Sequence, residues 1–208
     1  MTSLPSPIGR GPDARSTDVP QGGGVPTWLA ASITHCASCG SLLELRTVVG
    51  EERPRLVCVD NGHITYVNPR LVSTALPITD AGEVVLLRRG FEPGRGLWAQ
   101  PGGFLEVDET PSEGAMRETL EEIGLVVATG DIVGLYARLE AAVIVLAYEA
   151  AIVGGELGTT PEATEVRAFA PAAIPWPEIA FRTTWWALVD WLARRHPDVQ
   201  PPEHPAGR

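Results

Sequence analysis

Apolar and polar positions follow two different periods along this chain. Between residues 70 and 170, short runs rich in valine, leucine and isoleucine are separated by polar or glycine-containing turns, a pattern typical of β-strands. Two other stretches repeat apolar residues every three to four positions, which predicts amphipathic helices at 111–123 and 181–194. The predicted strands are 71–78, 83–88, 125–128, 132–137, 142–152 and 165–170. Helices on both sides of a mixed β-sheet would give an α/β/α sandwich.

The ends of the first predicted helix are marked in the sequence. Thr110 is a good N-cap residue, Pro111 suits the first helical position, and Glu113 completes a Thr-x-x-Glu capping box. Gly124 supplies a stop, because glycine readily enters the left-handed conformation that ends many helices. The helix is therefore expected to run from residue 111 to residue 123.

This helix has two distinct faces. Glu118 and Glu122 lie one turn apart on one face, with Glu121 beside them. Most helix faces of this kind are simply acidic surfaces exposed to solvent. That interpretation does not account for the flanking glycines, Gly103 and Gly124, or for the single arginine, Arg117. The buried stripe is expected to consist of residues at i, i+4 and i+7: Met116, Leu120 and Ile123.

Residues 103–125, which read GFLEVDETPSEGAMRETLEEIGL, are crowded with carboxylates. They contain seven acidic residues, and Arg117 is the only base among them. Such crowding costs free energy through repulsion unless a cation neutralises the charges. Hard divalent cations such as Mg²⁺ and Mn²⁺ take oxygen ligands of this kind. The stretch therefore predicts a metal site.

The spacing within this stretch resembles the Nudix box, G-x5-E-x7-R-E-U-x-E-E-x-G-U, where U is a bulky aliphatic residue. The first U position holds Thr119, which is expected to weaken the apolar anchor of the helix slightly, and Leu125 fills the last one. The resemblance to the Nudix hydrolase family also implies an α/β/α sandwich. The seven fixed positions of the box are filled by Gly103, Glu109, Arg117, Glu118, Glu121, Glu122 and Gly124.

The resemblance implies roles for the residues of the box. The backbone near Gly103 is expected to add an oxygen ligand to the metal. Arg117 is expected to pair with Glu109 or Glu121 and so to hold the ligand carboxylates, although an ordinary helix pair with Glu113 is an equal alternative. The expected ligands of Mg²⁺ or Mn²⁺ are three glutamates of the helix: Glu118, Glu121 and Glu122.

Hydrolysis also needs a base and a substrate-binding surface. In the family, a glutamate beyond the box often serves as the base, and Glu165 is the first candidate here, with Glu162 second. Either is equally consistent with a plain surface carboxylate. Trp98 is a candidate for stacking on a nucleobase, although buried tryptophans are commoner. Phe181 and Arg182 are further candidates for substrate binding.

The resemblance implies attack of water on a phosphoanhydride in a nucleoside diphosphate linked to another moiety, X. The products would be a nucleoside monophosphate and phosphorylated X. ADP-ribose and FAD are the favoured substrates, because the SQPWPFP-type motif of NADH pyrophosphatases is absent from the sequence. An NADH pyrophosphatase and a non-catalytic nucleotide-sensing module are the alternatives. Homodimers are frequent in the family, so a homodimer is also an open alternative.

All three cysteines lie in one segment ahead of the box. Their spacing resembles a zinc ribbon, C-x2-C-x15–20-C-x2-C, which precedes the catalytic domain in one subset of Nudix enzymes. The fourth cysteine position holds Asn61, and His63 is the candidate to complete a Cys₃His zinc site, with His35 weaker. A degenerate ribbon without metal is an equal alternative. The expected sulfur ligands of Zn²⁺ are Cys36, Cys39 and Cys58.

These features divide the chain into four parts. The proline- and glycine-rich residues 1–27 are expected to form a disordered leader, and residues 197–208 a disordered tail. Between them, residues 35–69 form a zinc-ribbon-like module and residues 70–196 form the Nudix domain.

Charge and cysteine usage narrow the partners and the compartment. A net charge of −10 argues against binding to duplex nucleic acid but not against a small nucleotide substrate held through a metal. The longest apolar run, 141–148, is too short to span a bilayer, so no membrane association is expected. An odd number of cysteines does not suggest a disulfide framework, and the cytoplasm is the expected location.

Overall fold

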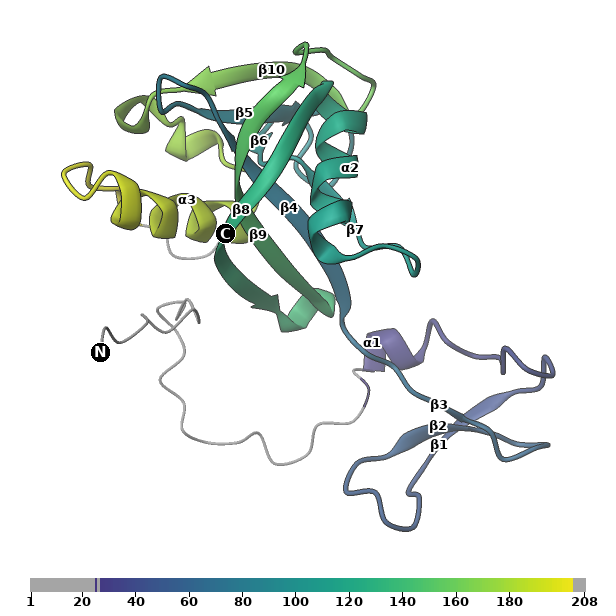
Figure 1. Ribbon diagram of the computed structural model, residues 1–208. Helices are drawn as coiled ribbons and strands as arrows, with labels where there is room; N and C mark the ends of the chain where they lie inside the picture. Colours follow the sequence, from purple (N-terminus) through teal and green to yellow (C-terminus); the bar gives the residue numbers. More distant parts are fainter. Residues whose placement is uncertain (1–24, 26, 204–208) are drawn as a thin grey trace, which may run out of the picture. The chain divides into compact units, whose positions relative to one another are not determined.

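The computed structural model describes residue 25 and residues 27–203 (Figure 1). Within this part of the chain there are two compact units, one ending at Asn68 and the other beginning at Pro69. Almost all of the expected leader, 1–27, and the last five residues of the expected tail lie outside the described residues.

The smaller unit contains a three-stranded antiparallel sheet in the order β1-β2-β3. Its buried apolar side chains are few: Cys36, Leu56, Val57 and Cys58. Domains this small usually need a metal, a disulfide or a partner to be stable, because they bury too little apolar surface. Its elements are α1 (Thr27–Ala30), β1 (Leu43–Arg46), β2 (Arg55–Cys58) and β3 (Ile64–Thr65).

The larger unit is built on a mixed seven-stranded sheet. Five strands follow the order β10-β5-β4-β9-β8, while β6 pairs with β5 and β7 pairs with β4. Strands β4 and β9 are parallel, and the other pairs are antiparallel. The strands are β4 (Arg70–Ile78), β5 (Val84–Arg89), β6 (Trp98–Ala99), β7 (Gly102–Phe104), β8 (Leu125–Arg138), β9 (Val143–Gly155) and β10 (Ala163–Phe169).

One helix covers each face of this sheet, α2 (Pro111–Ile123) and α3 (Arg182–Arg195) (Figure 1). The side chains of each strand alternate between the two faces. In β4, for example, Ala75 belongs to the core cluster that includes α2, and Leu76 belongs to the cluster that includes α3. The predicted α/β/α sandwich is therefore confirmed. Three short 3₁₀ helices lie in the connections: η1 (Leu139–Ala141), η2 (Pro171–Ala173) and η3 (Trp176–Glu178).

The predicted elements differ from the structure mainly at short strands. The two expected strands 125–128 and 132–137 are one continuous strand, β8, whose pairing with β9 is interrupted by register shifts. Strands β6 and β7 were not predicted, because two or three residues are too few to show a period. Gly102 and Gly103 lie in β7.

The predicted buried stripe of α2 is correct at Ile123, and Met116 is partly buried against the core, but Leu120 was wrong. Leu120 is 50% exposed, whereas Ala115, Thr119 and Ile123 are fully buried and form a stripe at i, i+4 and i+8. Thr119 does not weaken this stripe through an unpaired hydroxyl, because its Oγ1 donates to the carbonyl oxygen of Ala115 at 2.6 Å. The helix is rotated relative to the prediction because its core-facing side is chosen by the sheet beneath it.

The predicted ends of α2 are confirmed. Thr110 and Glu113 form the complete capping box, and Gly124 closes the helix in the left-handed conformation with φ of 75°.

Residues 197–203 of the expected tail are among the described residues. Val199 is partly buried against the core cluster that contains α3. None of the described helices is long and apolar enough to cross a membrane.

Candidate functional site

The box residues bring strand β7 against helix α2. The backbone N–H of Gly102 donates to Glu122 Oε2 at 2.8 Å. A Cβ atom at Gly103 would lie only 2.3 Å from Glu118 Oε1, so a side chain at this position would collide with the carboxylate. A side chain at position 103 would therefore force the Glu118 carboxylate out of this position, which glycine leaves free.

Arg117 connects three carboxylates on the same side of α2. It binds Glu109 in a bidentate manner, with Nε and Nη2 donating at 2.9 and 2.6 Å, and its Nη1 donates to Glu118 at 2.8 Å and Glu121 at 3.0 Å. The pairing alternative with Glu113 is not formed, because that carboxylate accepts from Thr110 in the capping box. The hydrogen bonds from Arg117 hold the pKa of Glu109 down at about 2.

Glu122 and Glu118 are carboxylates whose charge is poorly solvated. Glu122 is only 8% exposed, and burial raises its pKa to about 7, with the nearby charges of Glu118 and Glu162 adding to the effect. Burial also raises the pKa of Glu118, against the opposing hydrogen bond from Arg117. A bound cation would reverse both effects, since it stabilises the charged forms. This oxygen-rich donor set therefore fits Mg²⁺ or Mn²⁺.

Glu121 occupies a different environment from the other two glutamates of the expected ligand set. Its side chain is 59% exposed and its carboxylate accepts from Arg117. It is absent from the lining of the cavity described next, whereas Glu118 and Glu122 both line it. The structure thus brings two of the three expected metal ligands to the cavity.

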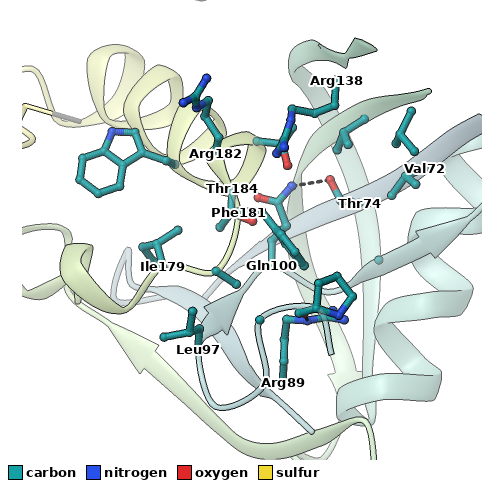
Figure 2. Close-up of a pocket in the computed structure, with 18 of the residues that line it drawn as sticks. Val72, Thr74, Arg89, Leu97, Gln100, Arg138, Ile179, Phe181, Arg182 and Thr184 are labelled. Carbon is teal, nitrogen blue, oxygen red and sulfur yellow. Dashed lines mark hydrogen bonds between the residues drawn. The ribbon is translucent and has the colours of Figure 1, made fainter. Parts of the chain in front are cut away.

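A cavity of about 1420 Å³ opens in the larger unit, and Glu118 and Glu122 line it. Figure 2 shows other residues of its lining. This volume exceeds the 300–1,000 Å³ typical of small-ligand sites, so it has room for a dinucleotide-sized molecule. Acidic side chains in its lining are Glu106, Glu118, Glu122, Glu162 and Glu203. Arginines in its lining are Arg70, Arg89, Arg138 and Arg182. The site therefore offers carboxylates for a metal and guanidinium groups for phosphate oxygens within one cavity.

Aromatic rings lie beside three of these arginines, one of which is Arg182, whose guanidinium lies 5.9 Å from the ring centroid of Trp186. The guanidinium of Arg89 lies 4.8 Å from the ring centroid of Phe181, and that of Arg70 lies 4.1 Å from the ring centroid of Phe104. Such contacts favour a fixed position for the charged group over a freely moving one. Arg70, Arg89 and Arg138 were not predicted as site residues, because no local pattern marks an arginine that lines a cavity built from distant segments.

Gln100 is a polar group of the cavity that the sequence analysis also missed. It is 6% exposed, and its Nε2 donates to Thr74 Oγ1 at 2.7 Å, while that hydroxyl donates to the carbonyl oxygen of Leu146. This chain of hydrogen bonds fixes the orientation of the carboxamide (Figure 2). Its Oε1 has no hydrogen-bond partner among the described residues. A buried acceptor of this kind is a candidate to receive a hydrogen bond from a bound ligand.

The three predicted substrate-binding residues have different fates. Trp98 is 1% exposed and packs edge-on against Phe169 with ring centroids 4.9 Å apart, so it presents no face for stacking on a base. That expectation was wrong, because β6 turns this side chain into the core. Phe181 and Arg182 do line the cavity, at the start of α3 (Figure 2).

The two candidate bases, Glu165 and Glu162, lie in different environments. Glu165 lies in β10, where it forms ion pairs with Arg88 at 3.1 Å and with Arg167, and it is not part of the cavity lining. Glu162 lines the cavity and lies close enough to Glu122 to raise its pKa. The structure therefore places the second candidate, not the first, beside the box glutamates.

The cysteine segment of the smaller unit forms a separate cluster. The sulfur atoms of Cys36, Cys39 and Cys58 all lie within 4.8 Å of one another. His63 does not join this group among the described residues, so the expected Cys₃His set is not formed. The alternative ligand His35 has its Nδ1 in a hydrogen bond with Thr34 Oγ1 at 2.8 Å. Three thiols at this separation fit a thiophilic ion such as Zn²⁺.

Fold and site together define an α/β/α sandwich in which a capped, carboxylate-rich helix borders a large cavity. A family model described as NUDIX domain matches residues 69–201, and another described as Nudix N-terminal matches residues 34–67. The chain therefore belongs to the Nudix family, with the zinc-ribbon region of that family ahead of its Nudix domain.

Known proteins show the same relationship. A Nudix hydrolase structure from Nitrosomonas europaea superposes with a TM-score of 0.73 at 31% identity, covering 83% of this chain and 97% of that one. An ADP-ribose pyrophosphatase of Methanocaldococcus jannaschii is 31% identical over 108 residues, covering 50% of this chain and 63% of that protein. The NAD-capped RNA hydrolase NudC of Pseudomonas aeruginosa is 28% identical over 171 residues, covering 80% of this chain and 58% of that protein. The chain thus spans less than two thirds of these curated relatives.

Proposed function

We propose that the protein is a divalent-metal-dependent hydrolase that cleaves a phosphoanhydride bond in a nucleoside diphosphate linked to X. The observation that carries this proposal is the pair of poorly solvated carboxylates, Glu118 and Glu122, at a cavity of about 1420 Å³. Both carboxylates are held against the backbone of Gly102 and Gly103. A site built this way favours a bound cation over two bare charges.

In this proposal Glu118 and Glu122 hold Mg²⁺ or Mn²⁺, and the backbone beside Gly103 adds an oxygen. Such an ion, when bound, neutralises phosphate charge and lowers the pKa of a bound water. Arg117 keeps the ligand carboxylate of Glu118 in place and, through Glu109, ties it to the loop before the helix. Glu121 then acts at the edge of the site as a partner of Arg117.

The remaining groups of the cavity serve the substrate. Arg70, Arg89 and Arg138 are suited to bind phosphate oxygens as charged hydrogen-bond donors. Glu162 is suited to accept a proton from the attacking water, because it lies beside Glu122 within the same cavity. Phe181 offers an apolar surface for a nucleobase or a second ring system.

ADP-ribose and FAD are the proposed substrates, giving AMP with ribose 5-phosphate or with FMN. The name of the Methanocaldococcus relative and the room in the cavity support this choice. An NAD-type dinucleotide is the second candidate, because the similarity to NudC extends over 80% of the chain and so includes part of the cysteine region. The absence of the SQPWPFP-type motif places it second.

A substrate panel tests this proposal. The full chain is incubated with ADP-ribose, FAD, NADH and nucleoside triphosphates in Mg²⁺ or Mn²⁺, and products are identified by chromatography and mass spectrometry. Release of AMP from ADP-ribose or FAD at the highest kcat/KM is expected. Tight binding of ADP-ribose without hydrolysis would instead support a nucleotide sensor, and no turnover of any compound would overturn the hydrolase proposal.

A further inference from the structure

The cysteine cluster is made by two turns with the same backbone structure. In the first, the N–H of Gly40 donates to the carbonyl oxygen of Cys36 at 2.8 Å, and the N–H of Cys36 donates to Ser41 at 2.8 Å. In the second, Gly62 donates to Cys58 at 3.1 Å, and Cys58 donates to His63 at 2.9 Å. The donors and acceptors are four and five residues apart in both turns.

The two glycines complete the correspondence. Gly40 has φ of 77° and Gly62 has φ of 71°, the left-handed conformation in each case. Cys39 lies three residues after Cys36 in the first turn, and Asn61 lies three residues after Cys58 in the second. Asn61 therefore takes the position that Cys39 has in the first turn. His63 corresponds to Ser41. Each of these residues contributes its backbone carbonyl oxygen to the turn, and its side chain takes no part. This explains why the imidazole of His63 is outside the sulfur cluster.

The side chain of Asn61 faces the sulfur atoms with its nitrogen. Its Nδ2 donates to Cys39 Sγ at 3.2 Å, and its Oδ1 accepts from the backbone N–H of His63 at 2.9 Å. The second contact fixes which end of the carboxamide points toward the cluster. An amide nitrogen has no lone pair to give to a metal, so the group at position 61 supplies a hydrogen bond and no metal–ligand bond.

The three sulfur atoms are close to the separation that a zinc ion requires. At a Zn–S distance of about 2.3 Å, tetrahedral ligands lie about 3.8 Å apart. Cys39 Sγ and Cys58 Sγ are 3.5 Å apart, and every pair lies within 4.8 Å. Small side-chain shifts are enough to place all three on one ion.

We propose that this cluster is a three-thiolate zinc site whose fourth coordination position is open to an exchangeable ligand such as water. Asn61 occupies the place of the missing fourth thiolate and acts as a hydrogen-bond donor to Cys39. Cys39 and Asn61 are both exposed, so the fourth coordination position of the zinc ion faces solvent. Such a site exchanges its metal and accepts external ligands more readily than a closed four-thiolate site, which has no open position.

Cobalt substitution of the full chain tests this proposal. Bound Co²⁺ gives intense sulfur charge-transfer absorption that scales with the number of thiolates, and oxygen ligands elsewhere in the protein do not contribute to it. We expect one sulfur-bound Co²⁺ per chain in the wild type, a spectrum that shifts when imidazole is added, and loss of the sulfur bands in Cys39→Ser. In Asn61→Cys the charge-transfer intensity should rise by about a third and the response to imidazole should disappear.

Zinc affinity, measured by competition with a chromogenic chelator, is a second test of the same proposal. We expect Asn61→Cys to bind zinc at least about tenfold more tightly, and Asn61→Ala to bind it more weakly while keeping one ion. His63→Ala, the matched control, should leave spectrum and affinity unchanged. A wild-type protein without sulfur-bound metal, or loss of a ligand band in His63→Ala, would overturn the proposal. Neither reading depends on hydrolase activity.

Discussion

The carboxylate site of the larger unit and the cysteine cluster of the smaller unit both gather metal-binding groups, but they are supported in different ways. At the carboxylate site, Glu118 and Glu122 are oriented by Arg117 and by the backbone of Gly102. They stand on a helix that is already packed against a core. At the cysteine cluster, two of the three thiols are themselves among the few buried side chains of their unit.

This difference has a thermodynamic consequence. A metal that binds to a site already held in place by a core affects the catalysed reaction more than the folding stability of the protein. A metal that joins segments with little core of their own contributes directly to folding. We therefore expect loss of the carboxylate site to abolish activity in a folded protein, and loss of the cysteine cluster to loosen the smaller unit while activity persists.

Removal of the divalent metal is expected to have the largest effect. Treatment with EDTA should lower kcat on the best substrate by at least about 1000-fold, or about 4 kcal/mol of transition-state stabilisation, because phosphate charge is then not neutralised. Added Mg²⁺ alone should restore the rate, because the larger unit keeps its fold through its own core. Activity that is lost with EDTA and regained only with Zn²⁺ would reverse the roles of the two regions.

The stability of the metal-free protein should reveal the cost of Glu122. Its pKa in the folded protein, about 7, is above the 4.5 of an unperturbed glutamate, so the unfolded chain loses this proton first as pH rises. Stability should fall between about pH 4.5 and 7, and at pH 8 Glu122→Gln should be more stable by about 3 kcal/mol. At pH 4 the two proteins should be equal.

Denaturant melts of EDTA-treated protein at pH 8 and pH 4 measure this effect. Glu121→Gln is the control, because the side chain is exposed on the same helix and its replacement should change stability little. A Glu122→Gln protein that is less stable than wild type at pH 8 would show that the carboxylate is not strained by burial.

Gly103→Ala should damage activity with little effect on the larger core. The new Cβ would lie 2.3 Å from Glu118 Oε1, so the carboxylate must move away from its position beside the strand. We expect kcat to fall by about 100-fold, since small displacements of positioned groups have effects of this size. Gly158→Ala is the matched control, because its Cβ would meet nothing nearer than 3.9 Å. Equal losses in the two variants would contradict the proposed close approach.

Arg117→Lys should have a smaller effect. Lysine keeps the charge but cannot bind Glu109 in a bidentate manner while also reaching Glu118 and Glu121. We expect kcat to fall by about tenfold, with a rise in the Mg²⁺ concentration needed for half-maximal rate. Arg46→Lys, which alters an exposed ion pair with Glu44 in the smaller unit, should change neither quantity.

Cys39→Ser should affect catalysis least. All the described residues that line the cavity belong to the larger unit, so kcat/KM should stay within about twofold of wild type. Hydrogen exchange should nevertheless become faster in β1 and β2, where loss of the bound metal removes a crosslink. A large loss of activity without such local opening would show that the cysteine cluster takes part in substrate binding.

The features predicted most accurately from the sequence are those that depend on interactions between residues close together along the chain. The ends of α2 follow from Thr110, Glu113 and Gly124, which act on their own neighbours, and both ends were correct. The metal-site prediction rests on spacings within 23 residues of one strand–helix segment. Leu120 was placed on the wrong face because the sheet beneath α2, and not the helix itself, selects the buried side.

Features that depend on distant strands escaped prediction. Gln100 and Arg70 face the cavity because β4 runs beside β7 and β9, a pairing that no local pattern encodes. Trp98 was offered as a stacking residue on the basis of its closeness to the box along the chain, yet the pleat of β6 directs it into the core. Between Glu162 and Glu165, three residues apart, only the course of β10 shows which one reaches the cavity.

We propose that the carboxylate pair of α2, Glu118 and Glu122, holds the ion on which hydrolysis of the substrate phosphoanhydride depends. Steady-state turnover of the best substrate in saturating Mg²⁺, compared between wild type and Glu122→Gln, tests it most directly. We expect Glu122→Gln to remain folded and to lose at least about 1000-fold in kcat. Equal turnover by the two proteins would contradict it.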